Sequence, residues 1–154
     1  MTRLAVWIGT VGGLGYFPIA PGTVGSAAGV AVYAAFVYWS VPLAAQCATI
    51  VLMSLVGIWA AAGTATFLGR EDPGPVVIDE VAGQLVTLVW TGAGLWGAVL
   101  GFFVFRVLDI IKPYPANRFE RLSGGLGIMA DDVMAGLYGN LMLQVAVRAI
   151  PGLR

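Results

Sequence analysis

The chain has 154 residues, of which 59% are hydrophobic and only 10% are charged, and its formal net charge is zero. Soluble domains usually carry about 25% charged residues and nucleic-acid-binding domains are usually basic, so the composition argues against both classes. Charged residues are absent from 4–69, 81–105 and 133–147, as a bilayer core requires. The sequence therefore predicts an all-α, polytopic integral membrane bundle of about five helices with Gly-rich re-entrant loops, forming one domain over 1–154.

The first half is predicted as a breaker-rich loop followed by two long apolar helices. Residues 4–13 are apolar but too few to span a bilayer. Residues 12–26 hold five glycines and two prolines, which predict a loop with exposed backbone N–H groups. The two helices are expected from Thr23 to Ser40, a length of about 27 Å, and from Leu43 to Leu68.

The second half is predicted as shorter helices separated by polar or glycine-rich turns. Their expected ranges are 79–90, 95–111, 116–122 and 131–148. The first two are short for full spans and are expected to form a hairpin, which the prolines at 113 and 115 end. The turns lie at 70–75 and 123–127.

Half of the formal charge falls within the 31 residues 106–136. These charged residues are Arg106, Asp109, Lys112, Arg118, Glu120, Arg121, Asp131 and Asp132. An even number of predicted passes separates each polar cluster from the next, so all the clusters are expected on one membrane face. That face holds most of the Arg and Lys residues, and the positive-inside rule makes it cytoplasmic.

Two acidic pairs, Asp79–Glu80 and Asp131–Asp132, stand at predicted helix starts, each with a glycine about one turn later. Two such starts side by side would bring four carboxylates together. Histidine is absent and the single Cys47 lies in an apolar run, so the ligands are oxygens, which suit Mg²⁺. The alternative is that each pair only caps its own helix.

Arg106, Asp109 and Lys112 follow one another at intervals of three residues, so they lie near one helix face. We expect Arg106 and Lys112 to bind phosphate, with hydroxyls of Thr23 and Ser26 as further donors; snorkelling cations and helix caps are the alternatives. For Arg118 and Arg121 snorkelling is favoured. Without His or a usable Cys, metal-assisted displacement at phosphorus remains. We expect water to attack with a carboxylate as its base; the alternative is an aspartate that forms an aspartyl-phosphate. Asp109 is expected to be a further catalytic acidic residue.

Four segments resemble the phosphatidylglycerophosphatase A family in their order and spacing. They are GYFPIAPGTVGS (15–26), VVIDEVAGQ (76–84), FRVLDIIKPYP (105–115) and GGLGIMADDVMAG (124–136). The resemblance implies a Mg²⁺-dependent phosphatase of the bacterial cytoplasmic membrane that hydrolyses phosphatidylglycerophosphate to phosphatidylglycerol and phosphate. The charged motif positions of the family fall on Asp79, Glu80, Arg106, Asp109, Lys112, Asp131 and Asp132.

Two other functions stay open. One is a Mg²⁺-dependent lipid phosphotransferase, although the pattern D-G-x-x-A-R with G-x-x-x-D-x-x-x-D of the CDP-alcohol transferases is absent. The other is a non-enzymatic small transporter subunit, which would place its acids near mid-span rather than at the predicted helix ends. The oligomeric state is left open.

Overall fold

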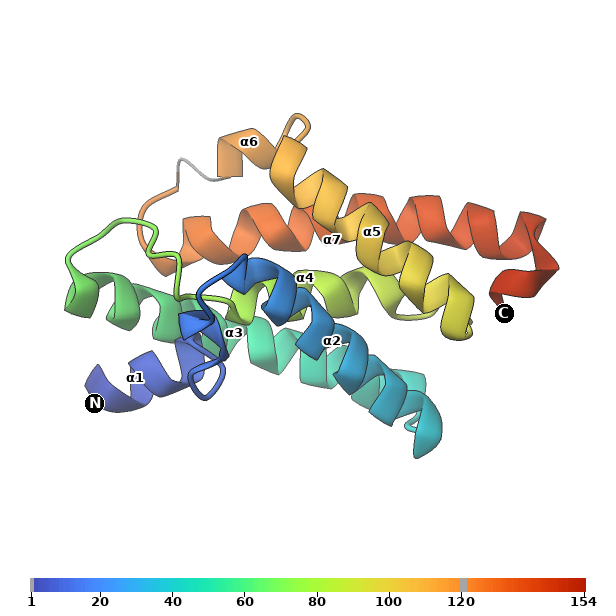
Figure 1. Ribbon diagram of the computed structural model, residues 1–154, viewed down its shortest axis with the longest axis horizontal. Coiled ribbons are helices and arrows are strands. Elements are labelled where there is room, and N and C mark those ends of the chain that lie inside the picture. The colour runs from blue at the N-terminus through green and yellow to red at the C-terminus, as the bar shows by residue number, and fades with distance from the viewer. Residues whose placement is uncertain (1, 120–121) are drawn as a thin grey trace.

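The computed structural model describes residues 2–119 and 122–154, and the regular structure within them is entirely helical (Figure 1). The all-α class is therefore confirmed for this part of the chain. The helices are α1 (Thr2–Gly9), η1 (Leu14–Tyr16), α2 (Pro21–Tyr38), α3 (Leu43–Leu68), α4 (Ile78–Leu88), α5 (Leu95–Ile111), α6 (Ala116–Phe119), α7 (Gly125–Ala149) and η2 (Pro151–Leu153).

The long apolar helices α2 and α3 form close to their predicted ranges. Helix α2 begins at Pro21 instead of Thr23, because the fixed φ of proline suits the first position of a helix. Among the described helices, these two are long and apolar enough to cross a bilayer. Only 17% of the apolar window of α3 is buried, so its side chains face outward, which is consistent with membrane association. Five crossings and re-entrant loops stay predictions.

Helix α4 lies at the centre of the bundle. All of its residues except Glu80 are buried, and it contacts α2, α3, α5 and α7. Its 11 residues give a length of about 16 Å, too short to cross a membrane. It ends at Leu88, two residues earlier than predicted, and Trp90 and Gly92 then turn the chain with positive φ. The expected hairpin forms, since α5 returns alongside α4 in the opposite direction (Figure 1).

Helix α7 begins at Gly125, not near Asp131 as predicted. The glycines at 125 and 127 had been interpreted as a loop. However, a Cβ on Gly125 would lie 1.9 Å from the Ile58 carbonyl oxygen, so this glycine permits close packing of α7 on α3. Asp131 and Asp132 therefore lie about two turns inside the helix. Capping, the alternative explanation for this acidic pair, does not apply to it.

The short surface helix predicted at 116–122 is described as far as Phe119, and Arg121 lies outside the described residues. The guanidinium of Arg118 lies 4.9 Å from the centroid of the Tyr114 ring, a cation–π contact. Arg118 therefore stabilises the turn after α5.

The C-terminal end of α4 lies inside the protein, where Asn140 of α7 supplies hydrogen bonds to it. The Asn140 Nδ2 donates to the carbonyl oxygens of Val86 at 3.0 Å, Thr87 at 3.2 Å and Val89 at 2.7 Å. These carbonyls belong to the last turn of a helix and its exit, where intrahelical donors run out. One amide therefore ties the end of α4 to α7.

We predict that Asn140→Leu lowers stability by about 1–3 kcal/mol, because buried carbonyls lose their donor. Thermal unfolding of the purified protein in detergent would measure the loss. Asn117→Leu is the matched control, since Asn117 is exposed on α6. Equal unfolding temperatures for the two variants would contradict the role of Asn140.

Candidate active site

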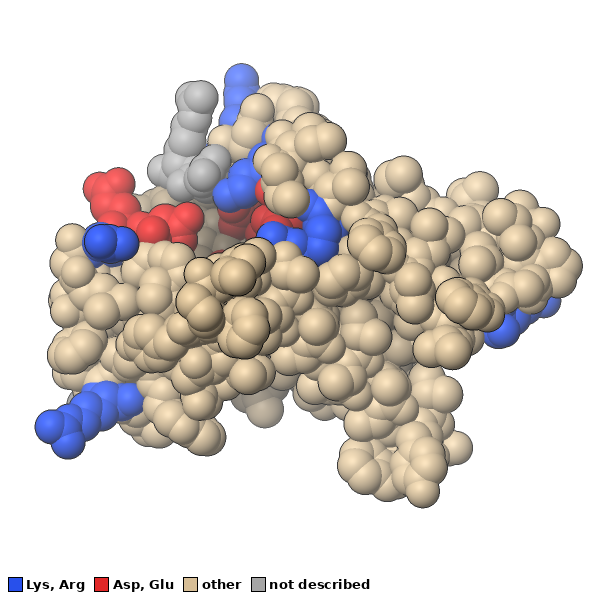
Figure 2. All heavy atoms as spheres, in the orientation of Figure 1, with Lys and Arg blue, Asp and Glu red and all other residues tan. Residues whose placement is uncertain are grey.

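A cavity of about 970 Å³ opens where one end of each of α2, α3, α4 and α5 meets the first turns of α7. Charged side chains gather in and around this hollow, whereas the surrounding face is almost uncharged (Figure 2). The charged residues that line it are Arg70, Glu71, Asp72, Asp79, Glu80, Arg106, Asp109, Lys112, Asp131 and Asp132. Polar clusters that are far apart in the sequence therefore meet at one site.

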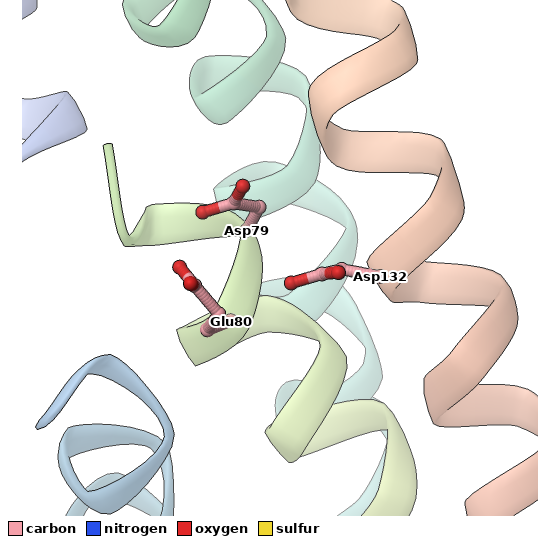
Figure 3. Close-up of side chains that lie close together, drawn as sticks. All are labelled: Asp79, Glu80 and Asp132. Atoms are coloured by element: carbon pink, nitrogen blue, oxygen red, sulfur yellow. The ribbon is translucent and has the colours of Figure 1, made fainter. Parts of the chain in front are cut away.

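Three carboxylates converge at the inner wall of this cavity. Asp79 and Glu80 stand on the first turn of α4, and Asp132 faces them from α7 (Figure 3). Each offers an oxygen within 4.8 Å of the other two. Asp79 Oδ1, Glu80 Oε2 and Asp132 Oδ2 are buried and have no hydrogen-bond partner among the described residues.

The electrostatics of this cluster favour a bound cation. Burial raises the pKa of the Asp79 carboxyl well above its ordinary value, and the charges of Glu80 and Asp132 raise the pKa further. Burial also raises the pKa of Glu80. Both residues lie outside the two apolar helices α2 and α3. A divalent cation would offset the repulsion between the carboxylates and satisfy their unpartnered oxygens, and three oxygen donors suit Mg²⁺.

Asp131, predicted as a fourth metal ligand, lies outside this group. Its Oδ2 accepts a hydrogen bond from Lys112 Nζ at 2.6 Å, and its Oδ1 accepts one from the Asp132 backbone N–H at 3.0 Å. Neighbouring residues on a helix point about 100° apart, so Asp131 faces α5 while Asp132 faces α4. In the structure, Asp131 therefore pairs with Lys112, whereas Asp132 belongs to the carboxylate cluster.

Arg106 lies beside the carboxylate cluster, where its Nη1 makes two contacts that hold it in place. This atom donates to Asp109 Oδ2 and to Ser26 Oγ, the latter at 3.5 Å. The Arg106 Nε is buried and has no partner among the described residues. Because a guanidinium has five N–H donors, Arg106 keeps donors for an anion in the cavity.

The two hydroxyls predicted to bind phosphate do not line the cavity. Ser26 is fully buried, and its Oγ donates to the Gly22 carbonyl at 2.9 Å while it accepts from Arg106. Ser26 therefore helps to hold the Arg106 side chain in place from outside the cavity. Thr23 is half-buried on α2, beside lining residues.

The sequence interpretation predicted the polar turn at 70–75 but gave it no part in the site. Arg70, Glu71 and Asp72 are exposed and line the cavity near the end of α3. No role had been given to Glu71 or Asp72. The available signal was charge: these residues interrupt the long uncharged run only seven positions before Asp79.

Comparisons with known proteins find relatives that are named as lipid phosphatases. The family model described as phosphatidylglycerophosphatase A matches residues 7–147. A protein of Bacteroides thetaiotaomicron, provisionally named a phosphatidylinositol-3-phosphatase, is 37% identical over 93% of each chain. The phosphatidylglycerophosphatase A of Escherichia coli K12 is 36% identical over 81% of this chain and 73% of its own. That of Haemophilus influenzae is 36% identical over 60% of this chain and 58% of its own. No solved structure matches the chain.

We predict that Asp79→Asn and Asp132→Asn each weaken binding of Mn²⁺, used as a spectroscopic substitute for Mg²⁺, by about tenfold or more. Each variant removes one of the three converging carboxylates. Asp131→Asn is the matched control on the same helix and should change the affinity by less than about threefold. Electron paramagnetic resonance of free Mn²⁺ would measure this. Equal losses in all three variants would contradict the division between Asp131 and Asp132.

Proposed function

Because the chain belongs to the phosphatidylglycerophosphatase A family, we propose that it removes the terminal phosphate of phosphatidylglycerophosphate. The products would be phosphatidylglycerol and inorganic phosphate. The observation that carries the proposal is the convergence of three carboxylates with Arg106 and Lys112 on one cavity. Family membership makes the chain a phosphatase, which argues against the transporter and phosphotransferase alternatives.

We assign Mg²⁺ to Asp79, Glu80 and Asp132, whose unpartnered oxygens fit an oxygen-preferring cation. Bound there, the metal would polarise a phosphoryl oxygen and offset negative charge as the reaction proceeds. The predicted ligand Asp131 is not included in this set, because it is engaged by Lys112.

The cations of the cavity would bind the phosphate. Arg106 offers donors in a planar fork that matches two phosphate oxygens, and Lys112 adds a point charge. Asp109 and Asp131 each hydrogen-bond to one of these cations and so fix its position. Preorganised positive charge stabilises the transition state because no reorganisation is needed during the reaction.

Water would attack phosphorus while the P–O bond to the glycerol oxygen breaks. A carboxylate of the cluster would accept the proton of the attacking water, and the departing oxygen would take up a proton to become the alcohol.

The lipid substrate implies a membrane location. We propose that the protein is a multi-pass protein of the bacterial cytoplasmic membrane with its cavity facing the cytoplasm. Two apolar helices and the outward-facing surface of α3 support membrane insertion. The positive charges around the cavity support the cytoplasmic orientation.

A second substrate follows from the Bacteroides relative, whose similarity extends over 93% of this chain. Phosphatidylinositol 3-phosphate also carries a phosphate monoester on its headgroup. The cavity recognises that monoester by the same cations in either lipid, so the two substrates differ in what fills the rest of the cavity.

We predict that the purified protein releases phosphate from phosphatidylglycerophosphate in mixed micelles, at a higher kcat/KM than from phosphatidylinositol 3-phosphate. EDTA should abolish release, and added Mg²⁺ should restore it. Asp79→Asn should be inactive while unfolding at the wild-type temperature. Full activity in EDTA would refute the metal assignment, and a preference for the inositol lipid would assign the second substrate.

We predict that Gly22→Ala lowers kcat/KM by about 10- to 100-fold with little loss of stability. A Cβ on Gly22 would lie 2.2 Å from Glu80 Oε1, so the flexible end of Glu80 must move away from the cluster. Gly74→Ala is the matched control, since Gly74 lines the same cavity and its Cβ would meet nothing within 4 Å. Steady-state kinetics and thermal unfolding would separate a displaced Glu80 from a disrupted fold.

A further inference from the structure

A shallow groove of about 170 Å³ lies between α2 and α5, outside the charged cavity. It is lined only by apolar side chains: Ala27 and Val30 of α2 with Ala98, Val99 and Phe102 of α5. The two helices are in contact and run in opposite directions (Figure 1). The start of α2 and the end of α5 therefore lie at the same end of the pair, and that end borders the cavity.

On α5, the groove and the cavity lie along one helix face. Val99, Phe102, Arg106 and Asp109 follow one another at intervals of three or four residues, which stacks them on one side of a helix. The first two line the groove and the last two line the cavity. The step along the axis from Phe102 to Arg106 is about 6 Å.

On α2, a similar continuity is found. Thr23, Ala27 and Val30 recur at intervals of four and three residues, and Ala20 immediately precedes the helix. Ala20 lines the cavity, Ala27 and Val30 line the groove, and Thr23 lies between them. The apolar groove thus leads along both helices to the wall that holds Arg106.

We propose that this groove binds one acyl chain of the lipid whose phosphate monoester enters the cavity. The proposal rests on the proposed function, because it requires a lipid phosphate beside Arg106. A phospholipid joins a charged headgroup to an apolar chain, so its binding site needs a charged part and an apolar part in continuity. Ala27 and Val99 are exposed, so the chain can enter sideways from the bilayer.

The groove gives the protein a means to prefer lipids over soluble phosphate monoesters. A soluble monoester would meet only the cavity, whereas a lipid would also gain apolar contact along α2 and α5. Thr23 lies where the polar glycerol part of the lipid would pass from the cavity to the groove.

Photolabelling tests the proposal without requiring turnover. The probes are phosphatidylglycerophosphate and phosphatidylglycerol that carry the same diazirine in one acyl chain, so they differ only by the terminal phosphate. Each is mixed on ice with the full-length protein in phosphatidylcholine nanodiscs and illuminated at once. The phosphate-bearing probe should label peptides covering 27–30 and 98–102 about fivefold or more above the other probe. Equal labelling would overturn the proposal, because the groove would then be ordinary lipid-facing surface.

Val99→Trp fills the groove and should remove most of this phosphate-dependent labelling. Val51→Trp is the matched control, since Val51 is 58% exposed on α3 and lies outside the groove. Unchanged labelling in Val99→Trp, or equal loss in both variants, would contradict the proposal. The wild-type comparison of the two probes decides the question even if Val99→Trp fails to fold.

Hydrolysis assays separate this proposal from the proposed function. Phosphate release with equal labelling by both probes would refute acyl-chain binding in the groove and support the proposed reaction. Phosphate-dependent labelling without phosphate release would support acyl-chain binding in the groove and refute the proposed reaction. Absence of both would overturn both.

Discussion

The close approach of α4 and α7 is the constraint on which the carboxylate cluster depends, since the cluster draws its members from both helices. A Cβ on Gly136 would lie 2.4 Å from the Gly83 carbonyl oxygen, and one on Gly83 would lie 2.6 Å from that of Asp132. Two glycines therefore let the backbones come closer than side chains of any size would allow. Asp132 reaches Asp79 and Glu80 because of this contact, and the Asn140 amide holds the same two helices together at the far end of α4.

Charge in this protein is concentrated where it can be compensated. Arg106 is paired with Asp109 and Lys112 is hydrogen-bonded to Asp131. Asp79, Glu80 and Asp132 each keep a buried oxygen without a partner among the described residues. Isolated buried charge is costly, so unpartnered acids of this kind are retained where a ligand completes them. The cavity thus combines a proposed cation site with fixed positive groups beside it, as recognition of a phosphate monoester requires.

The sequence predicted most helices well because long apolar runs and prolines indicate where helices can begin and end; α3 and α5 match their expected bounds. It also predicted that acids distant in the chain meet. The prediction of the start of α7 failed at Gly125. The sequence does not distinguish a glycine that permits close packing against the backbone of α3 from a glycine in a loop. The sequence could not show that Asp131 and Asp132 have different partners, because their directions depend on the rotation of α7 about its axis. It also could not show that Ser26 holds Arg106 and does not line the cavity.

Helix α4 begins at the wall of the cavity and ends within the bundle. The aligned peptide units of a helix act as roughly half a positive charge at its first turn and half a negative charge at its last. The positive end therefore faces the acids and any bound phosphate, while the negative end meets the Asn140 amide. The truncated helix supplies the cavity with a permanent electric field that no ionisable side chain has to provide.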